Sequence, residues 1–506
     1  MKKILTSIQF SSIYISLIVI VLVHVFFLLF NNDTYGGADN VQHFQVARYA
    51  FKYPELFLDL WGKPVYTLLV APFTLFGYIV AKGFNLVVAI ITIGLTAHLS
   101  EKIIKGSAVL VIWLIAFSPV YFFLIDTCLT EVLFSLVLVT SVYLFYENKL
   151  ILSALVLSII PFVRSEVIVL FPVFALAFML RKSYWQILLL SFGTILFSLI
   201  GLFVFGDILW ILHRFPYSME KSIYGSGSLL HFVNSSPFIF GVPFIVVLLV
   251  GFGFWIYQVF RSFSLKDENL VLFIIISGSF WVYFGAHSYV WWKGTGGSLG
   301  LTRVIGGVIP LAGIIAAKSI ELISEISRKK FFIKGLLFLL LFLQVFMLFK
   351  RYELPLRQEP IDKLVNKCSD YLKQYPLEGK IFYFNPQIVF YLNIDPYNQS
   401  KCNWGIADKL VPSNSMNFGD LIVWDAHFGS NEGGVPLNVL ENDNLLEEVK
   451  TFLPVEKIQV LGGYDYSIRI FKKVEKKNVD KSSAISKALS KTLTFEEYIV
   501  PEVISV

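Results

Sequence analysis

The chain has 506 residues, of which 56% are hydrophobic and only 15% charged, and its mean hydropathy of +0.69 is far too high for a soluble globular protein. The net charge of +6 does not indicate nucleic-acid binding, because the basic residues stand in short clusters between apolar runs, as membrane orientation signals do. The composition therefore predicts a polytopic α-helical membrane protein.

Apolar runs long enough to span a bilayer, about 17–25 residues each, occur along the first 350 residues. The first run follows Lys2 and Lys3 and has no small-residue cleavage site after it, so we expect a retained span with the N-terminus in the cytoplasm. About eleven spans are predicted, at 8–30, 84–100, 107–125, 128–146, 149–163, 166–181, 185–205, 238–260, 269–286, 304–321 and 331–349.

The segment 64–81 decides on which side of the membrane each later loop lies. It begins with Pro64 and is interrupted by Pro72, and we interpret it as a helix on the outer membrane interface, within a first external loop at 31–83. Only then do all the basic clusters lie on the cytoplasmic side, as positively charged loops do. These clusters are Lys102 with Lys105, Lys149, Arg181 with Lys182, Arg261 with Lys266, and residues 328–334.

The composition changes after residue 350, where charged residues and turn signals become frequent. Short strand-like runs at 380–384, 421–424 and 466–471 predict a small α/β domain at 351–473, on the extracytoplasmic side. Residues 474–506, rich in Lys and Ser at first, predict a flexible tail. The membrane domain is expected to occupy residues 1–350.

The first external loop concentrates charged residues beside aromatic ones, and Asp39 stands out among them. It follows Gly36 and Gly37 and precedes a run with apolar residues at helical spacing. It is therefore either a helix cap or a base that accepts a proton from a hydroxyl, and the two roles are compatible. Other polar residues of this loop expected in the same pocket are His43, Arg48 and Lys63.

Charged residues also stand at the ends of later spans that are predicted to face outside. Arg164 and Glu166 lie where two short apolar runs meet, either as a structural ion pair or as functional groups. Arg303 begins a span after a stretch rich in Trp and Gly, so it is either an interfacial anchor or a binding group for a lipid-linked phosphate. Lys293, in that stretch, is a further cationic candidate, and Asp126 and Glu131 are acidic candidates.

The order of these motifs resembles the GT-C superfamily of membrane glycosyltransferases, which use polyprenyl-phosphate-linked sugars. That superfamily includes protein O-mannosyltransferases, lipid A aminoarabinose transferases and oligosaccharyltransferase catalytic subunits. The resemblance covers residues 1–320 and rests on the order and spacing of short motifs. These are Asp39 before Ala47-Arg48, Lys63-Pro64-Val65-Tyr66, Ser118-Pro119, Thr130-Glu131, Arg164-Ser165-Glu166, and Gly297, Gly300 and Arg303 before a late span.

The resemblance implies a GT-C-like fold in which Asp39 deprotonates or orients the acceptor, with Asp126 and Glu131 as second acidic candidates. Lys63-Pro64-Val65 stands where the superfamily often has His-Pro-Pro, and Asp39-Asn40 where it often has Asp-Glu. These departures leave the acceptor and a need for a divalent metal open. No His or Cys spacing assigns a metal ligand.

We therefore predict a glycosyltransferase in a bacterial inner or plasma membrane. It moves a hexosyl or pentosyl group, with inversion, from a polyprenyl-phosphate donor to the hydroxyl of a lipid, glycan or protein on the extracytoplasmic face. Arg303, with Lys293 or Arg164, is expected to stabilise the departing phosphate. The loop 206–237 either covers the donor or only connects two spans, and the run 419–428 is either a core strand or an acceptor contact.

Two other classes of membrane protein remain alternatives. A transporter or lipid-linked saccharide flippase would carry charges deep within its spans and show internal symmetry, whereas the sequence shows no repeat and its charges crowd at one face. A ligase or polymerase of lipid-linked saccharides would place its main external loop late in the chain rather than after the first span.

Overall fold

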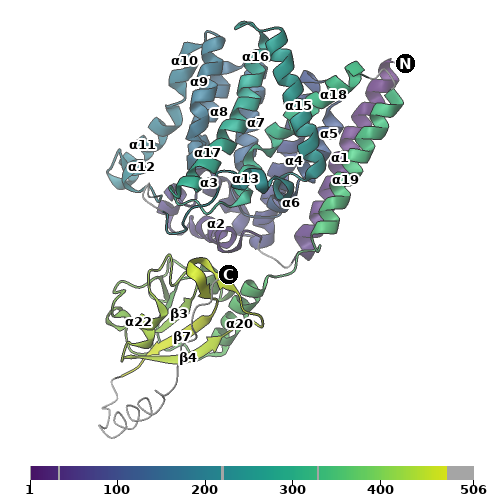
Figure 1. The fold of residues 1–506 in the computed structure, drawn as a ribbon. Helices are drawn as coiled ribbons and strands as arrows, with labels where there is room; N and C mark the ends of the chain where they lie inside the picture. The colour runs from purple at the N-terminus through teal and green to yellow at the C-terminus, as the bar shows by residue number, and fades with distance from the viewer. Residues whose placement is uncertain (1, 32–34, 218–221, 327–329, 476–506) are drawn as a thin grey trace, which may run out of the picture.

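The computed structural model describes residues 2–31, 35–217, 222–326 and 330–475, with side chains from residue 12 onward except at 330–334. The basic cluster 328–334 and nearly all of the predicted tail 474–506 therefore lie outside the described side chains. The described chain forms a helical bundle and a smaller domain at one end of it (Figure 1).

Helices built from long apolar runs make up the bundle, and several of them consist of two or three consecutive helical segments. They are α1 (Lys2–Phe30), α4 (Tyr78–Ile103), α5 (Ala108–Ala116), α6 (Pro119–Ile125), α7 (Glu131–Tyr146), α8 (Leu150–Ser158), η2 (Ile160–Phe162), η3 (Ser165–Leu170), α9 (Phe171–Leu180), α10 (Tyr184–Leu189), α11 (Phe192–Phe205), α15 (Val242–Arg261), α16 (Glu268–Leu272), η4 (Phe273–Gly278), α17 (Ser279–Lys293), η5 (Thr302–Val308), α18 (Ile309–Ile326) and α19 (Lys330–Arg351).

Among the described residues, six helical runs are long and apolar enough to cross a membrane, or seven if the bent pair α5 and α6 forms one span. The chain is therefore an integral membrane protein. The other four predicted spans coincide with the shorter apolar helices α7, α8 with η2, and η3 with α9, and with α19. The polytopic helical fold is confirmed, while the number of crossings stays a prediction.

The predicted span 107–125 is not straight. Its two halves, α5 and α6, meet at an angle of 75°. The cause is local, because Ser118 is extended and Pro119 occupies the first turn of α6, where its missing N–H requires no partner. A face of α6 is thereby turned toward the loops at the end of the bundle that faces the smaller domain.

Short helices fill the loops of the bundle: α2 (Gly37–Tyr49), η1 (Pro54–Leu58), α3 (Pro64–Thr74), α12 (Trp210–His213), α13 (His231–Asn234) and α14 (Ser236–Ile239). The predicted interfacial helix 64–81 is wrong in its extent. The helix α3 ends at Thr74, and residues 78–81 already belong to α4, because Gly77 turns the chain with a φ of +106°. At 11 residues α3 is about 16 Å long, against about 30 Å of hydrocarbon.

Two cysteine variants test the predicted orientation, because the exposed residues Glu55 and Lys105 lie on either side of α4. We expect Glu55→Cys to react with a membrane-impermeant maleimide in intact cells, and Lys105→Cys only after permeabilisation. The native Cys128, Cys368 and Cys402 are buried free thiols and should give little background. The reverse labelling pattern would invert the topology.

Residues 360–473 form the smaller domain around its own hydrophobic core. Its five-stranded mixed sheet has the order β2-β1-β3-β7-β4, with β1 parallel to β2 and β3, and β7 antiparallel to β3 and β4. The elements are α20 (Pro360–Gln374), β1 (Ile381–Tyr383), α21 (Pro386–Tyr391), β2 (Cys402–Trp404), η6 (Pro412–Ser415), β3 (Leu421–Asp425), α22 (Leu437–Glu441), β4 (Leu446–Phe452), β5 (Gln459–Val460), η7 (Leu461–Gly463), β6 (Tyr464–Asp465) and β7 (Ile468–Lys473). The strands β1, β3 and β7 coincide with the three predicted strand-like runs.

The smaller domain is held against the first loop of the bundle by polar and aromatic contacts. Asp395 accepts hydrogen bonds from Lys52 Nζ at 2.7 Å and from the Tyr53 hydroxyl at 3.1 Å. The ring of Phe390 packs edge-on against Phe44 of α2, with 5.8 Å between centroids. The domain therefore lies over the loop that carries Asp39.

Candidate active site

Asp39 lies in the first turn of α2, but it does not cap that helix. The N-cap position is Gly36, with a φ of +87°, and no side chain caps α2. The carboxylate instead forms an ion pair with Arg303 of η5, which is 264 residues away in the sequence. The cap interpretation is therefore wrong, and the ion pair is what holds Asp39 in place.

Gly36 permits the close approach of Arg303. The Nη1 of Arg303 donates to the Gly36 carbonyl at 3.2 Å, and a Cβ atom on Gly36 would lie 2.7 Å from the same Nη1. The left-handed φ of Gly36 also favours glycine. One guanidinium thus holds both the turn before α2 and the carboxylate in its first turn.

The ion pair continues into a chain of alternating charges. The Nε of Arg303 lies 3.7 Å from Oε1 of Glu131, the first residue of α7. The same Oε1 lies 2.8 Å from Nη1 of Arg164, and Nη2 of Arg164 lies 2.6 Å from Oε1 of Glu166. Each guanidinium in this chain therefore bridges two carboxylates.

Lys63 is a buried cation next to this chain of charges. It is only 5% exposed, and its Nζ contacts the Tyr217 hydroxyl at 3.0 Å and Ser165 Oγ at 3.4 Å. Among the described residues, no carboxylate lies within salt-bridge distance of it. The ammonium also lies over the Tyr217 ring, 4.7 Å from its centroid. A buried ammonium held by hydroxyl groups and a ring, without a counter-charge at salt-bridge distance, is costly, so this position favours the binding of an anion.

The backbone at Lys63 is also unusual. Its φ of +67° is rare for a residue with a side chain, and it stands immediately before α3, which begins at Pro64. Such strained residues cluster at binding and catalytic sites, where the surrounding structure holds them. The strain supports a functional role for Lys63 independently of its charge.

Exposure differs sharply along the network. The side chain of Asp39 is 42% exposed, whereas those of Glu131, Arg164 and Arg303 are 2%, 13% and 12% exposed. In the described part of the chain, Oδ1 of Asp39 has no hydrogen-bond partner, since the contact to Arg303 is made by Oδ2. The network therefore opens to solvent at the carboxylate of Asp39.

His43 lies one turn after Asp39 on α2, stacked on Trp61 with 4.6 Å between ring centroids. Burial lowers the pKa of His43 to about 3, so the ring is neutral at neutral pH. Its buried Nδ1 has no hydrogen-bond partner among the described residues. His43 thus presents a neutral imidazole beside the charged network.

The smaller domain contributes side chains near Asp39. The hydroxyl of Tyr224, in the loop 206–237, donates to Oε1 of Glu432 at 2.7 Å. Burial raises the pKa of Glu432 and the Asp39 carboxylate adds to the rise, although the bond from Tyr224 opposes it. Burial lowers the pKa of His427, while the charge of Asp39 acts against that fall. Tyr224, His427 and Glu432 therefore all lie within electrostatic reach of Asp39.

Three of the residues singled out from the sequence lie outside this network. Asp126 instead pairs with His24 of α1, with 3.2 Å between Oδ2 and Nδ1. Lys293 is exposed and lies against the ring of Trp292, 4.0 Å from its centroid. Arg48 lines a cavity of about 230 Å³ between α2 and α21. None of the three touches Asp39 or Arg303.

Sequence reasoning missed two contact residues, Tyr217 and Tyr224. Both stand in the loop 206–237, whose possible role over the donor was noted without naming either contact. Glu432 was missed as well, because it follows the noted run 419–428 by four residues and carries no motif. His427 belongs to that run, whose contact with the acceptor stays a prediction.

The described side chains do not fit a resident metal ion. They contain no group of three or more His, Cys, Asp or Glu placed to bind one. The carboxylates of Asp39 and Glu131 are already engaged by guanidinium groups. We therefore derive no step of a reaction through a metal.

Two solved structures resemble the whole chain. One is ArnT from Cupriavidus metallidurans in the apo state, with a TM-score of 0.57 over 90% of this chain and 97% of that one. The other is the same protein bound to undecaprenyl phosphate, with a TM-score of 0.54 over 92% of this chain and 97% of that one. The chain has an ArnT-like fold.

The ArnT-like fold agrees with the expected polytopic helical membrane protein that ends in a small α/β domain. Sequence identity to either structure is only 10%, so the likeness establishes the fold alone. No protein-family model and no curated protein matches the sequence. The roles of individual residues must therefore be argued from the geometry of the network.

Proposed function

We propose that this protein is a membrane glycosyltransferase that moves a sugar from a polyprenyl-phosphate donor to an acceptor hydroxyl at the extracytoplasmic face. The observation that carries the proposal is the buried ammonium of Lys63, without a carboxylate partner among the described residues, in the region of the accessible carboxylate of Asp39. A phosphate at Lys63 and a hydroxyl at Asp39 are the two groups that such a reaction must hold.

The reaction needs one proton acceptor and one site for developing negative charge. The acceptor hydroxyl gives its proton to Oδ1 of Asp39 as its oxygen forms a bond to the anomeric carbon. The bond between that carbon and the phosphate oxygen breaks, and the electron pair leaves with the lipid phosphate. Lys63 and Arg164 stabilise this leaving group, and Arg303 holds Oδ2 of Asp39 so that Oδ1 faces the acceptor.

The fold of an ArnT structure that was solved with undecaprenyl phosphate bound supports a lipid phosphate as the donor's carrier. The sugar and the chemical nature of the acceptor are argued separately, because fold alone does not specify either. The mannosyltransferase-like and aminoarabinose-transferase-like alternatives differ in the sugar and both agree with the charged network.

Incubation of the purified protein with a panel of polyprenyl-phosphate sugars tests the proposal. We expect release of polyprenyl phosphate with at least one donor, and transfer of the sugar when acceptor is supplied. No release with any donor, together with solute uptake by liposomes that contain the protein, would favour the transporter instead.

Lys63→Gln tests the phosphate contact. We expect the KM for the donor to rise by about 10- to 100-fold, because a hydrogen bond to a charged group is lost. The kcat should fall as well, because Lys63 also stabilises the departing phosphate. Lys293→Gln is the matched control, since Lys293 is exposed and packs on Trp292 rather than contacting the network, and its KM should stay near that of the wild type. An unchanged KM in Lys63→Gln would remove Lys63 from the donor site.

A further inference from the structure

A cavity of about 260 Å³ has walls from the turn before α2 and from the start of η5. Tyr35 and Thr302, which immediately precede Gly36 and Arg303, form part of its wall. The other lining residues are Val120 and Phe123 of α6, Ser235, Phe238 of α14, and Tyr352 just after α19. The bend between α5 and α6 gives this cavity its α6 wall.

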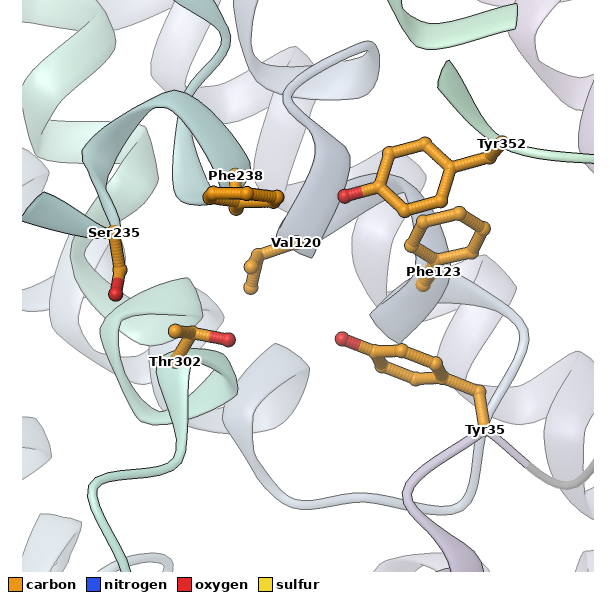
Figure 2. Close-up of a pocket in the computed structure, with 7 residues that line it drawn as sticks. All are labelled: Tyr35, Val120, Phe123, Ser235, Phe238, Thr302 and Tyr352. Carbon is orange, nitrogen blue, oxygen red and sulfur yellow. The ribbon is translucent and has the colours of Figure 1, made fainter.

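The lining combines aromatic rings with hydroxyl groups. Four of the seven lining side chains carry a hydroxyl, and four are aromatic, with Tyr35 and Tyr352 counted in both sets. Figure 2 shows the hydroxyls of Tyr35, Thr302 and Tyr352 pointing toward the same space. Each of these hydroxyls can both donate and accept a hydrogen bond, which matches the hydroxyl groups of a sugar.

The cavity is suited to a neutral ligand. No charged side chain lines it, and Arg351, which stacks on Phe238 with its guanidinium carbon 3.4 Å from the ring centroid, is not among the lining residues. A phosphate is expected to bind at the cations Lys63 and Arg164 instead. An isoprenoid tail would gain nothing from a wall that carries four hydroxyl groups.

The volume of the cavity limits the size of its ligand. Sites for drug-sized ligands measure about 300–1,000 Å³, so a cavity of about 260 Å³ has room for one sugar ring rather than an oligosaccharide. Val120 and Phe123 are buried, whereas Phe238 is 48% exposed, and Tyr35, Ser235, Thr302 and Tyr352 are partly exposed. The cavity can therefore be reached from outside the bundle.

We infer that this cavity binds the terminal sugar of a neutral glycan acceptor and presents one of its hydroxyls to Asp39. In an inverting displacement the acceptor and the leaving phosphate lie on opposite sides of the anomeric carbon. Tyr35 and Thr302 of the cavity wall immediately precede Gly36 and Arg303, which hold the Asp39 end of the network, whereas Lys63 and Arg164 mark its other end. This assignment of the acceptor rests on the proposed function, but binding of the sugar does not depend on turnover.

Ligand-observed NMR on the protein in nanodiscs tests binding directly, with the methyl glycosides of glucose, galactose, mannose and N-acetylglucosamine as probes. We expect saturable binding of at least one glycoside. Tyr35→Phe combined with Thr302→Val removes two hydroxyls and keeps the shape of the wall, so binding should weaken about tenfold. Tyr289→Phe combined with Thr295→Val makes the same two chemical changes outside the lining and should bind as the wild type does.

If the first double variant unfolds, Ser235→Ala with Tyr352→Phe replaces it, with the same expectation. Wild-type affinity in a folded cavity variant, or no saturable binding of any glycoside to the wild type, would overturn the inference. Displacement of the glycoside by farnesyl phosphate would overturn it too, because the cavity would then hold the lipid.

Turnover separates the acceptor sugar from the donor sugar. For the Tyr35→Phe and Thr302→Val variant, we expect a higher KM for the acceptor and unchanged hydrolysis of the donor by water. An equal loss of donor hydrolysis would assign the cavity to the donor sugar and contradict the inference. If no donor is cleaved by the wild type although glycosides bind as expected, the proposed function fails and the sugar site stands.

Discussion

An Asp39→Asn variant is expected to lose turnover by about 100-fold or more while it still folds and binds the donor. The amide has the size of the carboxylate and can still accept a hydrogen bond from Arg303, but it cannot take the proton of the acceptor. Since Asp39 does not cap α2, the substitution should not loosen that helix. Release of polyprenyl phosphate, measured at equal amounts of folded protein, checks this expectation.

Asp59→Asn is the matched control, because Asp59 lies in the same loop and only accepts a hydrogen bond from the Gly62 amide at 2.7 Å. It should keep near wild-type turnover. Asp39→Ala additionally leaves the buried Arg303 with Glu131 as its remaining carboxylate, so it should be less stable than Asp39→Asn. Near wild-type turnover of Asp39→Asn would move the base to another acidic residue, such as Glu131 or Asp126.

The helices were predictable because each span is a long apolar run that no other part of a membrane protein resembles. The position of a break was harder to predict. The 75° bend at Ser118-Pro119 and the early end of α3 depend on local backbone conformations. Such turns interrupt an apolar run without changing its hydropathy.

The charged candidates were predictable as a set, since ionisable groups at the ends of spans are expensive and call for a partner. Their partners were not. Asp126 and Glu131 are five residues apart and look alike in the sequence, yet Asp126, after the end of α6, pairs with His24, while Glu131 at the start of α7 joins the two arginines. Pairs such as Asp39 with Arg303 form across 264 residues and depend on how helices pack.

That packing depends on small residues where α7 meets η5. A Cβ atom on Gly307 would lie 1.9 Å from the ring of Phe134, so only glycine allows this approach. The same approach brings Arg303 within 3.7 Å of Glu131. The sequence shows a glycine near the start of a late predicted span, but not that the glycine sets the distance between two charges.

The largest expected effect on stability comes from Glu131→Gln. Glu131 is 2% exposed, and its Oε1 contacts both Arg164 and Arg303. The substitution keeps the size of the side chain but removes the shared counter-charge of two buried guanidinium groups. Removing one partner of a buried ion pair costs about 3–5 kcal/mol, which we expect to appear as a lower unfolding temperature in nanodiscs.

Glu147→Gln is the control for the loss of a carboxylate, because Glu147 pairs with Lys102 at a more exposed position and the change should leave the unfolding temperature nearly unchanged. A second variant separates charge from packing. If uncompensated charge causes the loss, Glu131→Gln combined with Arg164→Met should be more stable than Glu131→Gln alone, because one unpaired guanidinium is removed as well. A Glu131→Gln protein as stable as the Glu147→Gln control would contradict this expectation. It would mean that water or lipid already compensates the charges of both arginines. The charged network would then not be what holds Arg303 against Asp39.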